Sequence, residues 1–462
     1  MTDRPDTVTT HPTPDDAIID GLRTRLRGPL LQPDHAEYER ARRVWNGMID
    51  RRPAAIARCS GVADVMTAVE FARTHSLRVA VRGGGHNVAG HAVCDGGLVI
   101  DLSQLRGVRV DAAQRTARAA AGCTWGDFDR ETQALGLATT GGEVSSTGIA
   151  GLTLGGGLGW LMGRCGLACD NLLSADVVTA DGRLLVASAG EHADLFWGLR
   201  GGGGNFGIVT SFEYRLHPIA TVLAGLILYP MSRARDVLRA YRDCTAVAPD
   251  ELTIMGALLA TPDGTPAVGA IVCHCGVLDE GKRLIAPLRR LGAPLVDTIA
   301  PTPYVALQSM LDPSAPAGRR NYWKASFVRD LSDAAIDALI APAAGMPSPY
   351  SSVLIEHLHG AVTRVAPAAT AFGVRTDHYS IGIFSVWEDA ADSAAHIRWA
   401  RDTASGMEPF SDGGAYVNYL GEDGQMQVRA AYGANYDRLA ALKNIYDPTN
   451  FFRLNQNIPP SF

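Results

Sequence analysis

The spacing of hydrophobic and polar residues predicts alternating helices and strands over the first half of the chain. Helices are expected where apolar residues recur three or four positions apart, and strands where they alternate or run together. The predicted helices are residues 20–50 (most clearly amphipathic at 36–49), 62–75, 125–135 and 194–199. The predicted strands are residues 53–59, 77–81, 98–101, 108–110, 116–121, 172–180, 183–188 and 207–216. Ser60 and Thr124 precede two of the helices and are suited to act as N-caps.

The pattern changes after about residue 217, where glycine becomes sparse and longer strands mix with longer helices. Strands are expected at 221–230, 252–259 and 267–277, and helices at 233–246, 279–291, 333–342 and 438–446. The chain is therefore expected to be α+β, with a second domain built on an antiparallel sheet flanked by helices. The predicted parts are a disordered or extended segment 1–35, domains 36–217 and 218–410, and a C-terminal segment 411–462 that returns to the first domain.

Composition and charge exclude several classes of partner. The chain has 462 residues, 47% hydrophobic and 19% charged, which is typical of a globular protein. A formal net charge of −6 without a basic block argues against a nucleic-acid partner. No apolar run reaches the ~18–20 residues of a membrane span. Residues 1–15 lack the basic and apolar regions of a signal peptide, so a cytoplasmic location is expected.

The eight cysteines are scattered and do not resemble a disulfide framework. Cys165 and Cys169, and the run Cys273-His274-Cys275, lack the two well-spaced ligand pairs of a zinc site. We expect free or buried thiols and no metal.

The hexapeptide Arg82-Gly-Gly-Gly-His-Asn87 follows a predicted strand. Glycine backbones tolerate positive φ and expose N–H groups that can hold an anion such as a pyrophosphate. His86 adds an imidazole that can act as nucleophile, base or ligand. A glycine-rich turn with a surface histidine fits the same letters, so the loop alone leaves both interpretations open.

The other glycine clusters also lie between residues 83 and 207. Residues 202–207 match G-x-G-x-x-G, but a helix precedes them and a strand follows, which is the reverse of a Rossmann site. Segment 148–160 is almost uncharged and suits either a planar aromatic ligand or a tightly packed turn.

Several motifs together resemble the flavin domain of vanillyl-alcohol-oxidase-type (PCMH-type) flavoproteins and, at the C-terminus, its berberine-bridge-enzyme-like branch, to which bacterial 6-hydroxynicotine oxidase belongs. These motifs begin at Arg82, Gly148, Gly166, Asp194, Gly204, Tyr432, Tyr446 and Asn455. The resemblance implies a two-part FAD-binding domain, with the flavin 8α-methyl bonded to the histidine at the position of His86. Many relatives add a bond from a cysteine to flavin C6, but Val144 stands at that position, so a single covalent link is expected.

The resemblance also implies which residues contact FAD. The loop 83–87 is expected at the pyrophosphate, segments 142–160 and 204–209 along the ribityl and adenine parts, and a C-terminal cluster near the isoalloxazine. The expected contacts are Arg82, Gly83, Gly84, Gly85, His86, Asn87, Gly142, Thr147, Gly148, Gly151, Gly157, Gly204, Asn205, Val209, Tyr416, Asn418, Asn455 and Asn457.

Catalysis is expected to need a base as well as the flavin, because the substrate loses a proton when its hydride leaves. Candidates are Glu356, then His357 or His359, with Tyr416 near the flavin. On a strand, Glu356 would face one side and the two histidines the other. Tyr322, Trp323 and His378 could wall the pocket, and an exposed strand edge with incidental charges remains the alternative.

Three functions fit these features. An oxidase would take hydride from a C–H next to an alcohol or amine of a small molecule, or cyclise it oxidatively, and pass the electrons to O2. A dehydrogenase would use another acceptor, and a resistance protein would only bind the small molecule. The Ala/Arg/Gly-rich composition suggests secondary metabolism; the substrate and the oligomeric state stay open.

Overall fold

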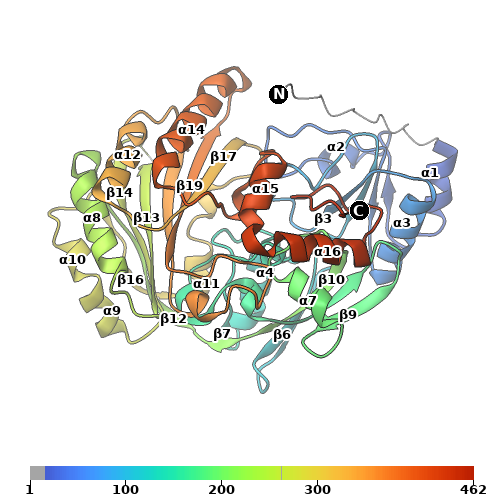
Figure 1. Cartoon of the computed structure of the whole chain (residues 1–462), viewed down its shortest axis with the longest axis horizontal. Helices are drawn as coiled ribbons and strands as arrows, with labels where there is room; N and C mark the ends of the chain where they lie inside the picture. Colours follow the sequence, from blue (N-terminus) through green and yellow to red (C-terminus); the bar gives the residue numbers. More distant parts are fainter. Residues whose placement is uncertain (1–15, 262, 462) are drawn as a thin grey trace.

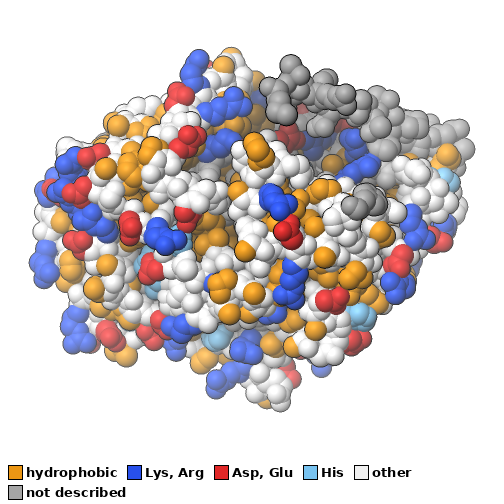
Figure 2. Space-filling model, in the orientation of Figure 1, with side chains coloured by type: hydrophobic (Ala, Val, Ile, Leu, Met, Phe, Trp, Pro, Cys, Tyr) orange, Lys and Arg blue, Asp and Glu red, His pale blue; other side chains and the backbone are white. Residues whose placement is uncertain are grey.

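The computed structural model describes residues 16–261 and 263–461 and shows two lobes side by side (Figure 1). The first half of the chain forms the lobe on the right, and residues from about 220 to 410 form the lobe on the left. On the described part of the face in Figure 2, positive and negative side chains are interspersed and form no continuous basic surface. None of the described helices combines the length and apolar character that a bilayer span requires.

The first lobe contains two principal sheets. One has the order β1 (Leu30–Leu31), β2 (Ala55–Arg58), β4 (Leu98–Asp101), β3 (Val79–Arg82), in which β4 pairs in parallel with both neighbours. The other is antiparallel, in the order β5 (Val108–Asp111), β6 (Thr116–Ala120), β10 (Ile208–Arg215), β8 (Leu172–Val178), β9 (Leu184–Ser188). A third pairing joins β7 (Leu137–Ala138) to β11 (His217–Pro218). The strands and both hairpins predicted for this region are confirmed.

Three longer helices and two short ones accompany these sheets. They are α3 (Val62–Thr74), α4 (Trp125–Gln133), α5 (Ile149–Leu154), α6 (Met162–Cys165) and α7 (Ala193–Leu199). Thr124 caps α4 as predicted: its Oγ1 accepts the amide of Asp127, and the Asp127 carboxylate accepts the amide of Thr124. The cap fixes the start of α4, a few residues after the end of β6.

The second lobe is one large antiparallel sheet. Its order is β15 (Val296–Asp297), β12 (Thr221–Pro230), β14 (Pro266–His274), β13 (Leu252–Ala260), β18 (Ser352–Leu358), β19 (His378–Trp387), β17 (Arg320–Val328), with β16 (Ala300–Pro303) also on β12. Helices α8 (Ala234–Thr245), α12 (Asp333–Ala343) and α14 (Ser393–Met407) pack against it and bury an apolar core. The predicted α+β class, with an antiparallel sheet flanked by helices, is confirmed.

The two lobes share an apolar cluster. Trp160 and Leu161 of the first lobe pack with Met255, Ile271 and Tyr304 of the second. Tyr304 begins α11 (Tyr304–Gln308), which contacts α4. This contact brings the large sheet against the glycine-rich segment that follows β7.

The C-terminal helices α15 (Gln425–Tyr432) and α16 (Tyr436–Tyr446) lie over the first lobe, where α16 packs on α7 (Figure 1). A fully buried lysine, Lys443, fixes them there. Its Nζ donates to Asp447 at 2.7 Å and to the backbone carbonyls of Asn205 and Phe452 at 2.8 and 2.9 Å. All three of its protons are used, so the last segment is fastened to the loop that follows α7.

Three predictions of secondary structure are wrong, two in the N-terminal region and one in the second lobe. Residues 20–50 are not one helix: they contain α1 (Asp16–Arg23), β1 and α2 (Tyr38–Ala41), because Gly28 passes so close to β2 that a Cβ would lie 1.8 Å from the carbonyl oxygen of Arg58. The same elements contradict an extended segment for residues 16–35; residues 1–15 lie outside the described part. The helix expected at 279–291 is broken into α9 (Leu278–Leu284) and α10 (Ala286–Arg289), with Pro287 in the first turn of α10.

Ser60 does not cap α3. The N-cap is Gly61, and Asp64 inside the first turn accepts the amides of Ser60, Arg27 and Gly28 at 2.8, 2.9 and 3.0 Å. A buried carboxylate therefore takes the capping role and also ties down the N-terminal segment.

We expect Lys443→Met to lower the free energy of unfolding by about 3–5 kcal/mol, because it leaves the Asp447 carboxylate buried without its cation. Urea denaturation followed by circular dichroism measures the change. Lys282→Met is the matched control, since Lys282 is exposed and pairs with the exposed Asp279, and its loss is expected to cost less than about 1 kcal/mol. Equal destabilisation by the two substitutions would contradict the role of the buried pair.

Candidate functional site

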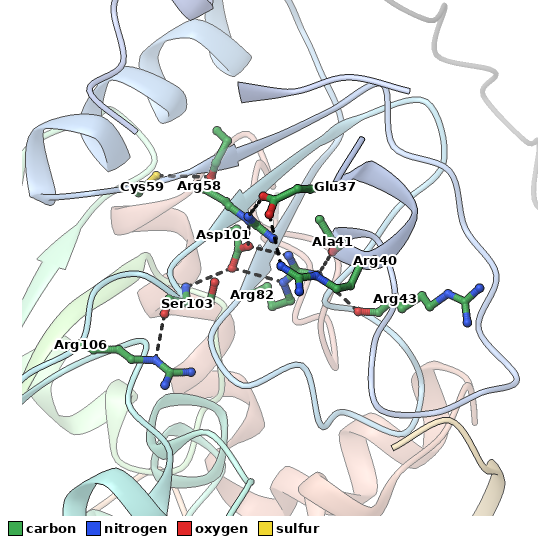
Figure 3. Close-up of polar contacts among 11 residues, drawn as sticks. Glu37, Arg40, Ala41, Arg43, Arg58, Cys59, Arg82, Asp101, Ser103 and Arg106 are labelled. Atoms are coloured by element: carbon green, nitrogen blue, oxygen red, sulfur yellow. Dashed lines mark hydrogen bonds and ion pairs between the residues drawn. The ribbon is translucent and has the colours of Figure 1, made fainter. Parts of the chain in front are cut away.

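The glycine loop starts from a fixed point, the guanidinium of Arg82 at the end of β3 (Figure 3). Its Nε and Nη2 donate to the two carboxylate oxygens of Asp101 on β4, at 3.3 and 2.5 Å. Its Nη1 donates to the backbone carbonyls of Ala41 and Arg43. Because these bonds occupy the side chain predicted to bind the cofactor, Arg82 anchors the loop, and its contact with a ligand would come through the backbone.

Two glycine segments far apart in the sequence meet beside this anchor. A Cβ on Gly84 would lie 2.4 Å from the backbone nitrogen of Gly148, and a Cβ on Gly148 would lie 2.4 Å from that of Gly84. Gly85 has a φ of +70°, in the region that favours glycine. Only glycine therefore permits loop 83–87 to pack on the segment that leads into α5.

His86 lies at the tip of this contact. Its Nε2 is 2.8 Å from the Oγ of Ser146, and its ring stacks on Trp45 with the centroids 4.8 Å apart. Burial lowers the pKa of His86 to about 4, against a smaller opposing effect of Asp312. The imidazole is neutral at physiological pH, so one of its nitrogens keeps a lone pair and can act as a nucleophile.

The loop that carries Ser146 is held from the second lobe. Asp312 accepts the backbone amide and the hydroxyl of Ser145 at 2.8 and 2.6 Å. Gln308 at the end of α11 donates to the carbonyl of Gly142 at 3.3 Å and to Asp129 of α4 at 2.8 Å. The position of this loop therefore depends on both lobes.

Two glycines predicted to contact the cofactor face open space. A Cβ built on Gly151 of α5, or on Gly204, meets no atom within 4 Å. The Oδ1 atoms of Asn455 and Asn457 are buried and find no hydrogen-bond partner in the described part of the chain. The open space beside the two glycines and the unpartnered oxygens of the two asparagines together fit a large ligand. Such a ligand would carry hydroxyl and amino donors, as FAD does.

Tyr416 is predicted to be catalytic, but its hydroxyl supports the triple-glycine turn. It accepts the amides of Gly157 and Leu158 at 3.0 and 3.3 Å and the Nδ2 of Asn418 at 2.7 Å. Gly157 needs to be glycine because its φ is +87°. Tyr416 thus shapes the triple-glycine turn, and its predicted catalytic role stays a prediction.

Other residues predicted to contact the cofactor use their side chains for local structure. Asn205 is fully buried and bonds to the backbone of residues 202, 456 and 458. The Oδ1 of Asn87 accepts the amide of His91 at 3.2 Å, and Val209 lies in the apolar core of the lobe. Thr147 accepts the amide of Trp125 with its backbone carbonyl at 2.9 Å. Their backbones, like those of Gly83 and Gly85, frame the site.

Glu356 comes from the second lobe, on β18, and is only 2% exposed. Its Oε2 accepts the hydroxyl of Tyr419 at 3.0 Å, while its Oε1 has no hydrogen-bond partner of good geometry among the described residues. Ser380 lies opposite on β19, and its hydroxyl is likewise unpartnered. Burial raises the pKa of Glu356 to about 7, against smaller lowering effects of Tyr419 and Ser380.

A second carboxyl, Glu143, lies in the loop between Gly142 and Ser145. Burial raises its pKa well above the ordinary value, and the charge of Glu356 raises it further. Charges on both groups also raise the pKa of the buried Tyr419. The ionisation of Glu356 therefore disfavours that of Glu143.

His357 and His359 point to the opposite face of β18, as their alternation with Glu356 predicts. Their rings stack with centroids 5.0 Å apart, and His357 also stacks on Tyr379 at 4.8 Å. The Nε2 of His357 is 2.6 Å from Asp377. The structure therefore separates both histidines from Glu356, because they lie on the other face of the sheet, where His357 stacks on Tyr379.

Aromatic rings connect His86 to Glu356. Trp45 meets Trp323 edge to face at 5.6 Å, and Trp323 meets Tyr419 at 5.8 Å and Phe384 at 4.8 Å. A nucleophilic imidazole and a buried base are thus joined by an apolar wall. Trp323 was expected there, whereas Tyr322 bonds to Arg401 and His378 to Asp412, away from this wall.

Sequence reasoning missed Glu143, Ser146 and Tyr419. Tyr419 lies three positions after Tyr416. In a turn of helix, such as the one formed by Val417–Tyr419, this spacing brings two side chains to the same side, and it was the signal available in the sequence. Glu143 is the only charge in the segment 142–160 before Arg164, and an acid in so apolar a stretch was a second signal. All eight cysteines are free thiols, and the described residues hold no group of three or more ligands arranged for a metal.

Comparison with known proteins adds to this geometry. A family model for an FAD binding domain matches residues 53–188, and one described as berberine and berberine like matches residues 415–459. (R)-6-hydroxynicotine oxidase of Paenarthrobacter nicotinovorans is 33% identical over 454 residues, 94% of this chain and 97% of the relative. An FAD-linked oxidoreductase of Dictyostelium discoideum is 32% identical over 448 residues, 96% of this chain and 97% of the relative.

Solved structures agree. 6-Hydroxy-D-nicotine oxidase from Arthrobacter nicotinovorans superposes with a TM-score of 0.85 at 31% identity, over 94% of this chain and 98% of that one. Physcomitrella patens BBE-like 1 has the same fold, with a TM-score of 0.86 at 24% identity over 96% and 99% of the two chains.

The contact between the glycine segments gives a direct test. Gly84→Ala is expected to destabilise the protein by about 1–3 kcal/mol and to lower its cofactor content, because the methyl group forces the two backbones apart. Thermal unfolding and the absorbance of the purified protein measure both effects. Gly190→Ala is the control, since a Cβ there meets nothing within 4 Å. A Gly84→Ala protein as stable and as fully loaded as the control would disprove the contact.

Proposed function

This chain belongs to the berberine-bridge-enzyme-like family of FAD-linked oxidoreductases, and we propose that it oxidises a C–H bond next to an amine or alcohol of a small organic molecule. The observation that carries the proposal is the position of a neutral, half-buried His86 and a buried carboxyl, Glu356, at the two ends of an aromatic wall. FAD is the cofactor of the family, and the open surface at Gly151 and Gly204 fits it.

We propose that residues 36–217 and 411–462 hold FAD and that 218–410 supply most of the substrate pocket. FAD, when bound, supplies the two-electron acceptor for the substrate's hydride. His86 would form the single covalent link to the flavin, since Val144 stands where relatives have a second, cysteine link. Loop 83–87 would hold the pyrophosphate with its backbone N–H groups.

Glu356 is the proposed base. Its unpartnered Oε1 is free to take a proton from the substrate, and Tyr419 holds the other oxygen in place. The raised pKa of Glu356 brings it close to the pH of the cell, where a general base is most effective. His357 and His359 face away, so they are not proposed as bases.

We further propose O2 as the electron acceptor, with hydrogen peroxide as the product. The support is that a relative identical at 33% over 94% of this chain is named an oxidase. A dehydrogenase on the same scaffold is the alternative, and the acceptor that turnover requires distinguishes the two.

The covalent link is tested by denaturing the protein in acid. The yellow colour is expected to stay with the polypeptide, and mass spectrometry is expected to place the flavin on the peptide that contains His86. His86→Ala should release its flavin on denaturation and turn over more slowly. His91→Ala is the control, because His91 lies in the same turn and its amide is held by Asn87. Flavin that stays bound in His86→Ala would rule out the proposed link.

The base is tested by a pH profile of kcat/KM, with hydrogen peroxide release as the readout. Glu356 has to be ionised to accept a proton, so kcat/KM is expected to fall as the pH drops below about 7. Glu356→Gln is expected to lose about 10²–10⁴-fold in kcat and to lose this acidic limb. Asp377→Asn removes a carboxylate from the other face of the sheet and should keep the profile. Turnover that needs an artificial acceptor instead of O2 would exclude the oxidase.

A further inference from the structure

Helix α4 of the first lobe and helix α11 of the second pack against each other where the lobes meet (Figure 1). Each contributes one buried polar residue: Asp129 is 0% exposed and Gln308 is 1% exposed. The Nε2 of Gln308 donates to Oδ2 of Asp129 at 2.8 Å and to the carbonyl of Gly142 at 3.3 Å. The other oxygen of each side chain, Oδ1 of Asp129 and Oε1 of Gln308, is buried and has no hydrogen-bond donor among the described residues.

Turning the amide of Gln308 over would not supply the missing donor. Its oxygen would then face the Asp129 carboxyl and the carbonyl of Gly142, which both accept hydrogen bonds. The two acceptors therefore fix which way the amide points. One further proton, placed on Oδ1 of Asp129, would satisfy both unpartnered oxygens at once, because a carboxylic acid and a primary amide can form two parallel hydrogen bonds.

The surroundings of Asp129 favour the neutral form. Burial raises the pKa of Asp129 to about 7, and the hydrogen bond from Gln308 opposes this only in part. Tyr304, one turn earlier on α11, stays neutral because burial raises the pKa of its hydroxyl, and a charge on Asp129 would raise it further. Of the other elements that chiefly pack on α4, β7 is apolar. Apart from Asp127 in the capping box, the other charged residues of α4 and β5 are exposed: Arg109, Asp111, Arg130 and Glu131.

We propose that Asp129 is a neutral carboxylic acid whose proton lies between its Oδ1 and the Oε1 of Gln308, and that this acid–amide pair connects the lobes and positions the 142–147 loop. Asp129 is a positioning residue, since it acts through Gln308 on the carbonyl of Gly142. Asp312 of the second lobe holds Ser145 in the same loop. The loop beside His86 thus has two attachments to the second lobe, and only the acid–amide pair depends on a proton. This role does not depend on the reaction proposed above.

Loss of the proton would weaken the connection. Oδ1 of Asp129 would then be a buried, negatively charged acceptor next to another acceptor, the Oε1 of Gln308. The pKa of Asp129 is about 7 in the folded protein and ~4 in an unfolded chain, so the folded protein keeps a proton that the unfolded chain releases. The stabilisation by the pair is therefore complete below about pH 4 and is lost as the pH rises through about 7.

Asp129→Asn tests the pair, because an amide can form the same two hydrogen bonds with Gln308 without a proton that titrates. Urea denaturation of the full-length protein as purified, followed by circular dichroism at pH 5 and pH 8, measures the folding equilibrium constant. We expect this constant for the wild type, relative to the variant, to fall about 100-fold from pH 5 to pH 8. Glu131→Gln makes the same change of charge at an exposed position of α4, and it is expected to follow the wild type to within about threefold.

Two further measurements separate the proton and the positioning role from a general effect of charge. An infrared difference spectrum, wild type minus Asp129→Asn at pH 5, is expected to show the carbonyl stretch of a protonated carboxyl, and this band should disappear at pH 9. Hydrogen–deuterium exchange of residues 142–147 is expected to be faster in the wild type than in Asp129→Asn at pH 8, and equal in the two proteins at pH 5.

Four results would overturn the inference. A ratio of folding constants that does not change with pH would mean that Asp129 is ionised throughout, with a buried water as its donor. The absence of the carboxyl band at pH 5, or equal exchange of residues 142–147 at both pH values, would remove the proton or the positioning role. An Asp129→Asn protein that does not fold would also contradict the pair, since the amide preserves both of its hydrogen bonds.

Discussion

The approach of two backbones, Gly84 and Gly148, governs the arrangement of the site, because no side chain fits between them. The contact sets loop 83–87 against the segment that leads into α5, and it places the imidazole of His86 beside Ser146. The buried pair Arg82–Asp101 fixes one side, and Asp312 and Gln308 fix the other through the backbone of the 142–147 loop. The site is therefore held by backbone contacts and by the bonds on its two sides, in a part of the chain that has few side-chain atoms.

The two lobes contribute different chemistry to one space. The first lobe offers backbone amides, bare glycine surface and a neutral imidazole, which suit a large polar cofactor. The second lobe offers Glu356 and the rings of Trp323 and Phe384, which suit a smaller organic molecule. Glu143 is the exception, because it is an acid of the first lobe whose pKa is raised by burial and by the charge of Glu356 on the second. Its position makes the protonation of the site depend on how the lobes are packed.

Local sequence predicted the fold where structure is decided locally. The hairpins of the first lobe, the Thr124 cap and the alternation of Glu356 with His357 follow from period and turn chemistry. The region 20–50 was mispredicted because its course is set by distant contacts, such as Gly28 against β2 and Asp64 with three amides. Of the site, the glycine loops and His86 were visible as motifs. The Tyr419 bond to Glu356 and the pairing with Glu143 join segments that the sequence keeps more than sixty positions apart, and no periodicity reports on such a pairing.

The hydrogen bonds made by Lys443 have a consequence for biosynthesis. Asn205 and Gly204, which border the space for a ligand, are tied to Lys443 and Asn455, and these residues leave the ribosome roughly 240 residues after Asn205 does. A nascent chain that ends before residue 443 lacks the hydrogen bond that holds the carbonyl of Asn205. The 204–205 segment therefore gains these hydrogen bonds only after the final helix and the residues that follow it have been translated.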